Sequence, residues 1–564
     1  MKKYIAIFLI ILGTLAFVGT KDTISDHYFQ ISKNLDIYFT LLQELDLYYV
    51  DEINPEQLVK TSIDKMLETL DPYTVFYPES KLEDYKFMTT GQYGGIGALI
   101  SKKGEHITIS DPYEGWPAQK SGLISGDIIL EIDGKSVKGK SVSDVSDLLK
   151  GEPGTTVTLK IKRYGKKEPL TFKIKREKIK IAAVPYYGML NNGVGYIKLR
   201  SFTLGCGDEV RTALKKLKAE NPQIKGIIFD LRGNPGGLLT EAINVANVFI
   251  PVNKKIVATK GKVKQWNRVY KTPSNSLDDS IHLVLLVDDG SASASEIVSG
   301  SIQDYDRGIL MGQRTFGKGL VQTTRDLSYN TKLKLTTAKY YIPSGRCIQA
   351  LDYSHKDKEG HATSIPDSLI KEFKTQKGRK VFDGKGILPD IVIELPEFPN
   401  YVIELIKQDA FFNYATLFYT RVKHIPEPPE FEITDSIMND FKNYLDTIHF
   451  TYECSTEKEL NKLEKTAKNE KYYHALQKDI EEIHKKLRED RKKDFEKHRK
   501  LIKQILEQEI AGRYYYQKGK LKAFLKYDPE TEEAIKILSD STLYNKYLTT
   551  SYTPGNDTLK VKKY

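Results

Sequence analysis

The chain has 564 residues and a net charge of +11, from 86 basic and 75 acidic side chains. This length allows several domains with large buried cores, which excludes a small scaffold held together by disulfides. Charges of both signs are mixed and no clustered basic motif is present, so nucleic-acid binding is not expected. The three cysteines, Cys206, Cys347 and Cys454, lie far apart without a C-x-x-C pair, so neither a zinc site nor a disulfide framework is predicted.

The first twenty residues have the pattern of a secretory signal. Lys2 and Lys3 precede an apolar run of about fifteen residues. We therefore expect the chain to be exported to an extracytoplasmic compartment, the periplasm. No cysteine follows the run, which argues against a lipoprotein. Residues 16–20 form a mediocre cleavage site, so an uncleaved inner-membrane anchor is the alternative.

Residues 21–87 are predicted to be helical and residues 88–177 to form a small β-domain. In the first region apolar residues recur at helical spacing around one break at Asn54-Pro55, which predicts two helices that pack on a neighbour or on a second copy of the chain. The second region has short β-rich runs separated by glycine turns, with one helix-like stretch, SVSDVSDLLKG.

Strands alternate with helices over residues 178–398. Two buried strand patterns, IKGIIFDL and IHLVLLV, are each followed by a turn and a helix pattern. This order predicts an α/β core, in which functional sites lie where strands end and helices begin.

Residues 399–564 form a Tyr- and Lys-rich C-terminal extension. Within it, residues 475–512 have apolar residues at helical spacing and end at Gly512, which predicts one long amphipathic helix with a weakly apolar middle. No chemistry is visible here, so packing or partner binding is the expected use.

The stretch GSASASEI, residues 290–297, has two interpretations. Ser293 and Glu296 have the spacing of a capping box, in which both side chains satisfy free backbone N–H groups at a helix start. A serine nucleophile favours the same place, because the unpaired N–H donors of a helix N-terminus can stabilise an oxyanion. Spacing alone does not decide between them.

The stretch GQRTFGKG, residues 312–319, matches a phosphate-binding loop except at Gly319, which replaces the hydroxyl residue that would hold Mg²⁺. The following residues alternate like a β-hairpin, whereas a phosphate loop must open a helix, so nucleotide binding is not expected. Lys318 can instead be the base for a serine, because a desolvated lysine loses its proton more readily. The alternative is a solvated loop lysine. The histidines of this region, His282, His355 and His361, lie in a buried strand or in a polar insertion and are poor bases.

Both stretches, together with IIFDLRGNPGGLLTEA, resemble the carboxyl-terminal processing peptidases, also called tail-specific proteases. The resemblance runs from about residue 35 to about residue 393 and leaves out the C-terminal extension. It implies a crotonase-like α/β protease core with an inserted PDZ domain, and cleavage of proteins near their C-termini outside the cytoplasm.

The resemblance also implies the catalytic residues. The family nucleophile falls on Ser293, the general base on Lys318, and the residue that orients the lysine on Gln322. The backbone N–H of Ala294 would be one oxyanion donor, and Gly236 or Gly237 in the turn GNPGG would supply the other.

The β-domain occupies the position of the PDZ domain. Its stretch YGGIGALI resembles the loop that binds a terminal carboxylate, followed by a strand that accepts the substrate tail by β-addition. A plain hairpin turn is the alternative. The expected contacts are Gly94, Gly95, Ile96, Gly97 and Ala98.

We therefore predict an exported serine endopeptidase whose PDZ domain captures free C-termini of protein substrates, with no cofactor and no metal. A catalytically silent PDZ scaffold that only binds C-terminal tails is the alternative. Apolar helices at both ends of the chain favour a homodimer.

Overall fold

The structure is a computed structural model that describes residues 26–550 and the backbone of residues 558–560. The predicted signal sequence, residues 1–20, lies outside the described residues. Within the described part, no helix combines the length and the apolar character needed to cross a membrane. The chain forms two compact units, one holding the described residues up to Phe76 with Thr324–Leu335, and the other holding the rest.

The first unit confirms the two predicted N-terminal helices. One spans residues 26–48 and the other is α2 (Pro55–Glu68). The break falls at the predicted place because the side chain of Asn54 accepts a hydrogen bond from the backbone N–H of Gln57 and Pro55 takes the first helical position. Apolar side chains of the first helix are largely exposed, for example Phe29 (62%) and Leu47 (69%).

The second unit begins with the predicted β-domain. Its sheet has the order β3-β4-β5-β7-β8, with β6 paired to β5, so β3 lies at an edge. The apolar side chains of these strands pack with α5, whose N-terminus is capped by Ser141. The elements are α3 (Leu82–Thr90), β2 (Gln92–Gly95), β3 (Ala98–Lys103), β4 (His106–Pro112), α4 (Pro117–Lys120), β5 (Ile128–Ile132), β6 (Lys135–Ser136), α5 (Val142–Leu149), β7 (Thr156–Lys162), β8 (Leu170–Lys175) and β9 (Glu177–Lys180).

The α/β core is built on a mixed sheet of the order β10-β11-β12-β15-β16-β23-β24. The strands from β11 onward are parallel and β10 is antiparallel to β11. The strands are β10 (Tyr186–Met189), β11 (Val194–Lys198), β12 (Gly226–Asp230), β15 (His282–Val287), β16 (Ile309–Gly312), β23 (Ile391–Glu394) and β24 (Thr558–Lys560).

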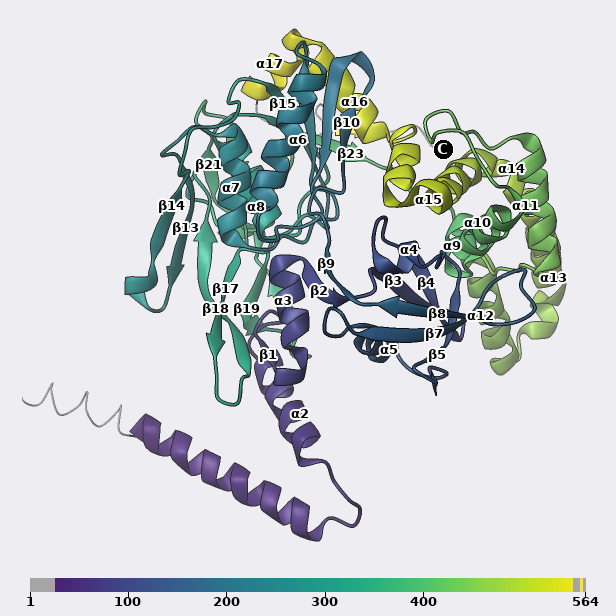
Figure 1. The fold of residues 1–564 in the computed structure, drawn as a ribbon, viewed down its shortest axis with the longest axis horizontal. Coiled ribbons are helices and arrows are strands. Elements are labelled where there is room, and N and C mark those ends of the chain that lie inside the picture. Colours follow the sequence, from purple (N-terminus) through teal and green to yellow (C-terminus); the bar gives the residue numbers. More distant parts are fainter. Residues whose placement is uncertain (1–25, 551–557, 561–564) are drawn as a thin grey trace, which may run out of the picture. The chain divides into compact units, whose positions relative to one another are not determined.

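Helices cover both faces of this sheet (Figure 1). Alternate strand residues such as Phe229 and Leu285 pack on α6 (Cys206–Glu220), α7 (Leu239–Phe249) and α8 (Ala294–Asp304). The intervening residues, such as Ile228 and Leu286, pack on α16 (Pro529–Ser539) and α17 (Ser541–Thr549). The C-terminal extension therefore completes the core, because a parallel sheet needs cover on both faces.

A second, largely antiparallel sheet flanks the core. It contains β13 (Lys255–Gly261), β14 (Arg268–Lys271) and β18 (Lys332–Tyr341), and β17 (Leu320–Asp326) pairs with β18. The same sheet includes β1, which is next to β18 in the strand order, and smaller strand pairs follow in the chain. Their bounds are β1 (Val75–Tyr77), β19 (Leu351–Lys356), β20 (Ala362–Ser364), β21 (Glu372–Lys374) and β22 (Lys380–Phe382).

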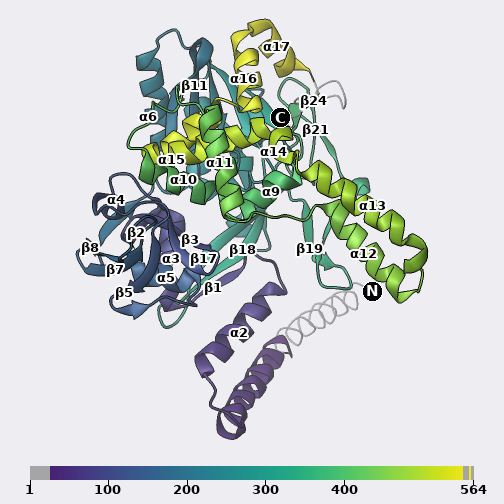
Figure 2. The same ribbon diagram turned by 90° about the vertical axis from the view of Figure 1, so that its right-hand side faces the viewer.

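The rest of the C-terminal extension is a helical bundle with its own apolar core (Figure 2). The bundle contains α9 (Asn400–Lys407), α10 (Ala410–Arg421), α11 (Asp435–Thr447), α14 (Asp494–Lys497) and α15 (Arg499–Leu525). Between α11 and α14, α12 (Ser455–Asn469) and α13 (Tyr473–Arg491) pack on each other. The prediction of one helix over residues 475–512 is wrong. The chain breaks around α14, where Phe495 is buried in the bundle core, and α15 runs past Gly512.

Candidate active site

Ser293 occupies an unusual backbone position between β15 and α8. It is the N-cap of α8 with φ = 55° and ψ = −109°, a region that a residue with a side chain rarely adopts. Such strain persists only where surrounding contacts enforce it, and it is typical of functional sites. The strained turn places Ser293 at the N-terminal end of a buried helix.

The two neighbouring serines have structural roles. The hydroxyl of Ser291 donates to the carbonyl of Leu231 (2.9 Å), and that of Ser295 donates to the carbonyl of Asn234 (2.8 Å). Both side chains are fully buried, whereas Ser293 is only half-buried. Of the three serines, Ser293 is therefore the one a substrate can reach.

Ser293 and Lys318 are held together by two side chains. One carboxylate oxygen of Glu296 accepts the backbone N–H of Ser293 (2.9 Å) and that of Lys318 (2.9 Å). The hydroxyl of Tyr340 lies at hydrogen-bond distance from the carbonyl of Ser293 (3.1 Å) and from that of Lys318 (2.5 Å). The structure thus brings the backbones of the predicted nucleophile and base to the same two groups, although the two residues are 25 positions apart in the sequence.

Glu296 is a fully buried carboxylate with further partners. Its other oxygen accepts the hydroxyl of Thr315 (2.6 Å) and the backbone N–H of Gly317 (2.7 Å). Burial raises the pKa of Glu296 to about 7, although the hydrogen bonds that its carboxylate accepts act in the opposite direction. The predicted capping contact with Ser293 is therefore present, and the same carboxylate also fixes the loop that carries Lys318.

The raised pKa of Glu296 predicts a pH dependence of stability. The folded state favours the protonated acid of Glu296. Its contribution to the unfolding free energy is therefore fully present below the unfolded pKa of 4.5 and is lost as pH rises through about 7. The Glu296→Gln variant lacks this titration. The unfolding free energy of the wild type relative to this variant should fall by roughly 3 kcal/mol between pH 4 and pH 8.

Denaturant unfolding of both proteins across this pH range checks the expectation. Glu481→Gln, which removes an exposed carboxylate on α13, is the control for the loss of one negative charge. A constant difference between wild type and Glu296→Gln over the whole range would show that Glu296 does not titrate there.

The turn GNPGG packs directly against residues 292–295, which we call the serine loop. The carbonyl of Asn234 accepts the backbone N–H of Ala292 (3.0 Å) as well as the hydroxyl of Ser295. A Cβ added to Gly236, which has φ = 96°, would lie 2.9 Å from the Cβ of Ser293 and 2.8 Å from the N atom of Ala294, so only glycine fits. The turn therefore lies against the predicted nucleophile and the predicted oxyanion donor.

The two candidate glycines of this turn differ in their hydrogen bonds. The N–H of Gly236 donates to the side-chain oxygen of Asn234 (2.9 Å). The N–H of Gly237 makes no hydrogen bond within the described part of the chain, while its neighbours Gly236 and Leu238 bond with Phe202.

Gln322 lies on β17, four residues after Lys318. Its side-chain amide donates to the hydroxyl of Thr336 (3.2 Å), which fixes the amide on the strand pair β17–β18. Its orienting role toward Lys318 stays a prediction. The strand that follows Gly319 confirms that this loop does not open a helix, as a phosphate loop would.

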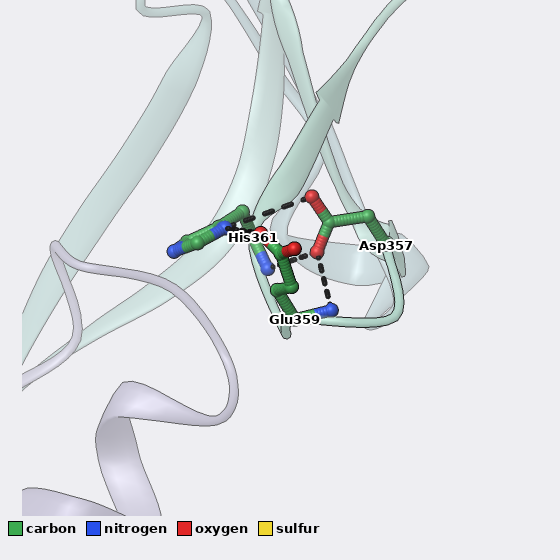
Figure 3. A group of neighbouring side chains, drawn as sticks. All are labelled: Asp357, Glu359 and His361. Atoms are coloured by element: carbon green, nitrogen blue, oxygen red, sulfur yellow. Dashed lines mark hydrogen bonds and ion pairs between the residues drawn. The ribbon is translucent and has the colours of Figure 1, made fainter. Parts of the chain in front are cut away.

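The histidines of the core serve other contacts. His282 stacks on Tyr544, with ring centroids 4.1 Å apart. His361 lies with Asp357 and Glu359 in the exposed turn between β19 and β20 (Figure 3). The carboxylate of Asp357 accepts the backbone N–H groups of Glu359 (2.9 Å) and His361 (2.8 Å), which accounts for the cluster as a tight turn.

The predicted carboxylate loop lies at the open edge of the β-domain. Gly94 and Gly95 belong to β2, which pairs with β9, and the carbonyl of the buried Ile96 accepts the N–H of Ala118 (2.7 Å). Gly97 has φ = 75°, and a Cβ there would lie 2.5 Å from the Cβ of Trp116. The loop then leads into Ala98, the first residue of the edge strand β3. This strand pairs with β4 on one side only.

Three family models match the chain. "Peptidase family S41" matches residues 193–354, "PDZ domain" matches residues 108–163, and "Probable PDZ-protease, C-terminal helical domain" matches residues 401–538. The last match covers most of the helical bundle together with α16.

Curated relatives include a "Carboxy-terminal-processing protease" of Bartonella bacilliformis, 37% identical over 57% of this chain and 73% of the relative. A "Probable CtpA-like serine protease" of Staphylococcus aureus is 32% identical over 69% of this chain and 71% of the relative. Among solved structures, a photosystem II D1 C-terminal processing protease is 30% identical and covers 58% of this chain and 91% of its own length, with a TM-score of 0.33.

Proposed function

This chain belongs to peptidase family S41 and is a serine-type C-terminal processing protease, and from this premise we propose that its catalytic dyad is Ser293 and Lys318. The observation that carries the proposal is the pair of bridges made by Glu296 and Tyr340, which hold the backbones of both residues. A Ser/Lys pair is a known variant of the serine protease mechanism.

In this mechanism the neutral amine of Lys318 accepts the proton of the Ser293 hydroxyl as its oxygen attacks the scissile carbonyl. The protonated amine then gives this proton to the departing amine of the product. Water, deprotonated by Lys318, hydrolyses the acyl-enzyme in the second half of the reaction. Gln322 is proposed to orient Lys318.

The oxyanion is proposed to be stabilised by backbone N–H groups. Ala294 supplies the first, because it follows the nucleophile at the N-terminus of α8, where the helix dipole also favours negative charge. Of the two turn glycines, the free N–H favours Gly237 as the second donor, since the N–H of Gly236 is already donated to Asn234.

The PDZ domain is proposed to capture the C-terminal tail of the substrate on β3. The strand lies at the sheet edge, and α5 lies beside it. A cavity of about 930 Å³ is lined by Leu99 and Lys103 of β3 and also by Gly233 of the turn, but not by Ser293. A substrate tail captured on β3 would therefore lie beside a cavity that extends to Gly233 of the turn GNPGG.

Capture of a free carboxylate predicts that amidation of the substrate weakens cleavage. The loop from Gly95 to Ala98 would offer N–H donors to a negative charge, and an amide removes that charge. We expect kcat/KM for a peptide with an amidated C-terminus to fall at least about tenfold, the loss of one charge-assisted contact.

Steady-state cleavage of matched free and amidated peptides measures this effect. The matched control is a peptide amidated on an internal aspartate side chain, which loses the same charge away from the terminus. Equal cleavage of the free and amidated peptides would reduce the glycine loop to a simple turn.

We also propose the fold type, the domain boundaries, the location and the oligomeric state of the chain. The core is proposed to be crotonase-like, with a signal or anchor at 1–20, an N-terminal helical region at 21–87, the PDZ domain at 88–177, the protease core at 178–398 and the helical extension at 399–564. The site of action is proposed to be extracytoplasmic. The exposed apolar side chains on the helix of residues 26–48 favour a homodimer as the resting state.

The alternative that the sequence left open is a silent PDZ scaffold. It would bind the same tails without cutting them. Incubation with an unfolded protein that has a free C-terminus separates the two, because the protease yields fragments with new termini and the scaffold yields only a complex.

A further inference from the structure

Arg232 links the C-terminal extension to the turn GNPGG beside Ser293. Arg232 ends the segment after β12 and directly precedes the turn GNPGG. Its guanidinium makes two hydrogen bonds to Asp528 (3.0 and 2.7 Å) and one to Glu530 (2.5 Å). Both acidic side chains are only 3% exposed and lie at the start of α16.

The same arginine is anchored from the protease core. Asp230 accepts its backbone N–H (2.8 Å) and its guanidinium (2.7 Å). The amine of Lys198 donates to the carbonyl of Arg232 (2.7 Å) and to Asp230 (3.0 Å). The guanidinium makes three hydrogen bonds to Asp230 and three to Asp528 and Glu530, so half of its hydrogen bonds come from the extension.

Arg232 is the first of a short series of fixed residues that leads to the nucleophile. The next residue, Gly233, donates its N–H to Asp288 (2.8 Å), and Asn234 bonds with the serine loop. Two residues further, Gly236 lies against the Cβ of Ser293. A shift of Arg232 therefore moves the turn that carries the proposed oxyanion donor.

Arg232 lies between carboxylates of the core and carboxylates of the extension, so its position depends on Asp528. Arg232 and Lys198 face three carboxylates, those of Asp230, Asp528 and Glu530. Asp528 contacts the guanidinium at Nη1 and Nη2, and Asp230 contacts it at Nε and Nη2. The orientation of the guanidinium therefore depends on one carboxylate of the extension and one of the core. Without Asp528, Arg232 keeps its contacts with Asp230 and Glu530 but loses the two-point contact from the extension.

We propose that Asp528 is a positioning residue for proteolysis. Through its contact with Arg232, the C-terminal extension fixes the position of the turn GNPGG, which carries the proposed oxyanion donor. The inference rests on the proposed function, because it assigns the turn to the oxyanion site. It gives the extension a part in the reaction beyond packing. A turn displaced by about 1 Å binds the transition state less well while substrate capture by the PDZ domain is unchanged.

The test uses the full chain with Asp528→Asn, which keeps the shape of the side chain and replaces one oxygen by a donor that faces the guanidinium. We expect kcat to fall about ten- to hundredfold with KM nearly unchanged. Asp528→Glu should recover part of the activity. Glu533→Gln on the same helix, whose carboxylate pairs with the exposed Lys536, is the matched control and should keep wild-type kcat.

Labelling with a serine-reactive phosphonate separates positioning from folding. The fraction of protein that can be labelled reports folded molecules, and the labelling rate reports the geometry of the site. The proposal predicts a lower rate at an unchanged fraction in Asp528→Asn. If the wild type is labelled at Ser293 and Asp528→Asn is labelled at the same rate, the positioning role alone is overturned. A smaller labelled fraction of Asp528→Asn at an unchanged rate also overturns it. A wild type that is not labelled at Ser293 overturns the proposed function together with this inference.

Discussion

Replacement of Ser293 by alanine is expected to abolish proteolysis, with a loss in kcat of about 10⁴-fold or more, as for other enzymes that lose a serine nucleophile. The reason is chemical, because the proposed mechanism forms the acyl-enzyme on the hydroxyl oxygen of Ser293. The fold should tolerate the change, since an alanine at this position keeps the Cβ and the backbone N–H that donates to Glu296.

Two measurements complete this prediction. Cleavage of an unfolded protein substrate is followed for the wild type and for Ser293→Ala, and unfolding curves confirm that both are folded. The control is Ser299→Ala on the same helix, a buried serine six positions further along the chain, which should retain activity. Proteolysis that persists in Ser293→Ala would place the nucleophile elsewhere.

Replacement of Lys318 by arginine is expected to be as damaging as its replacement by alanine, with each change costing at least roughly a hundredfold in kcat. A general base must lose its proton, and an arginine in a protein does not. Arginine therefore keeps the positive charge and removes the function. In the wild type the activity should rise with pH, because only the neutral amine accepts the serine proton.

The chain contains a matched control for this substitution. Lys385 also lies between two glycines, Gly384 and Gly386, but its amine pairs with Asp367. Lys385→Arg should retain activity. If Lys318 were instead a fixed cation for a phosphate group, the arginine variant would keep part of its activity and the wild type would bind ATP.

The sequence was sufficient for the local elements of the core. The patterns IIFD, HLVLLV and the helix after SASAS appear as β12, β15 and α8, because buried strands and capped helices have strong local signals. The alternating residues after Gly319 also appear as a strand, which argues against the phosphate-loop interpretation of Lys318 because such a loop opens a helix.

The contacts that join distant segments were not predictable. Glu296 was interpreted as a capping residue for Ser293, and its second contact, to Lys318, depends on how β16 and β17 return to α8. Tyr340 carried no signal, because one tyrosine in a strand pattern is typical of packing. The pairing of Arg232 with Asp528 joins residues 296 positions apart, and no local pattern reports such a contact.

The long helix expected over residues 475–512 failed for a related reason. Charged residues at helical spacing are compatible with one helix or with several. The weakly apolar middle of residues 475–512 is the only local sign of a break. The break is decided by tertiary packing, since Phe495 inserts into the core of the bundle and Tyr452 bonds with Asp494 beside it.

The Ser293/Lys318 dyad is tested most directly by the rate at which a phosphonate probe labels Ser293, measured by mass spectrometry in the wild type and in Lys318→Arg. The account predicts an adduct on Ser293 and a labelling rate at least roughly a hundredfold lower in the arginine variant at an equal folded fraction. An adduct on Ser291 or Ser295, or equal rates in the two proteins, would contradict it.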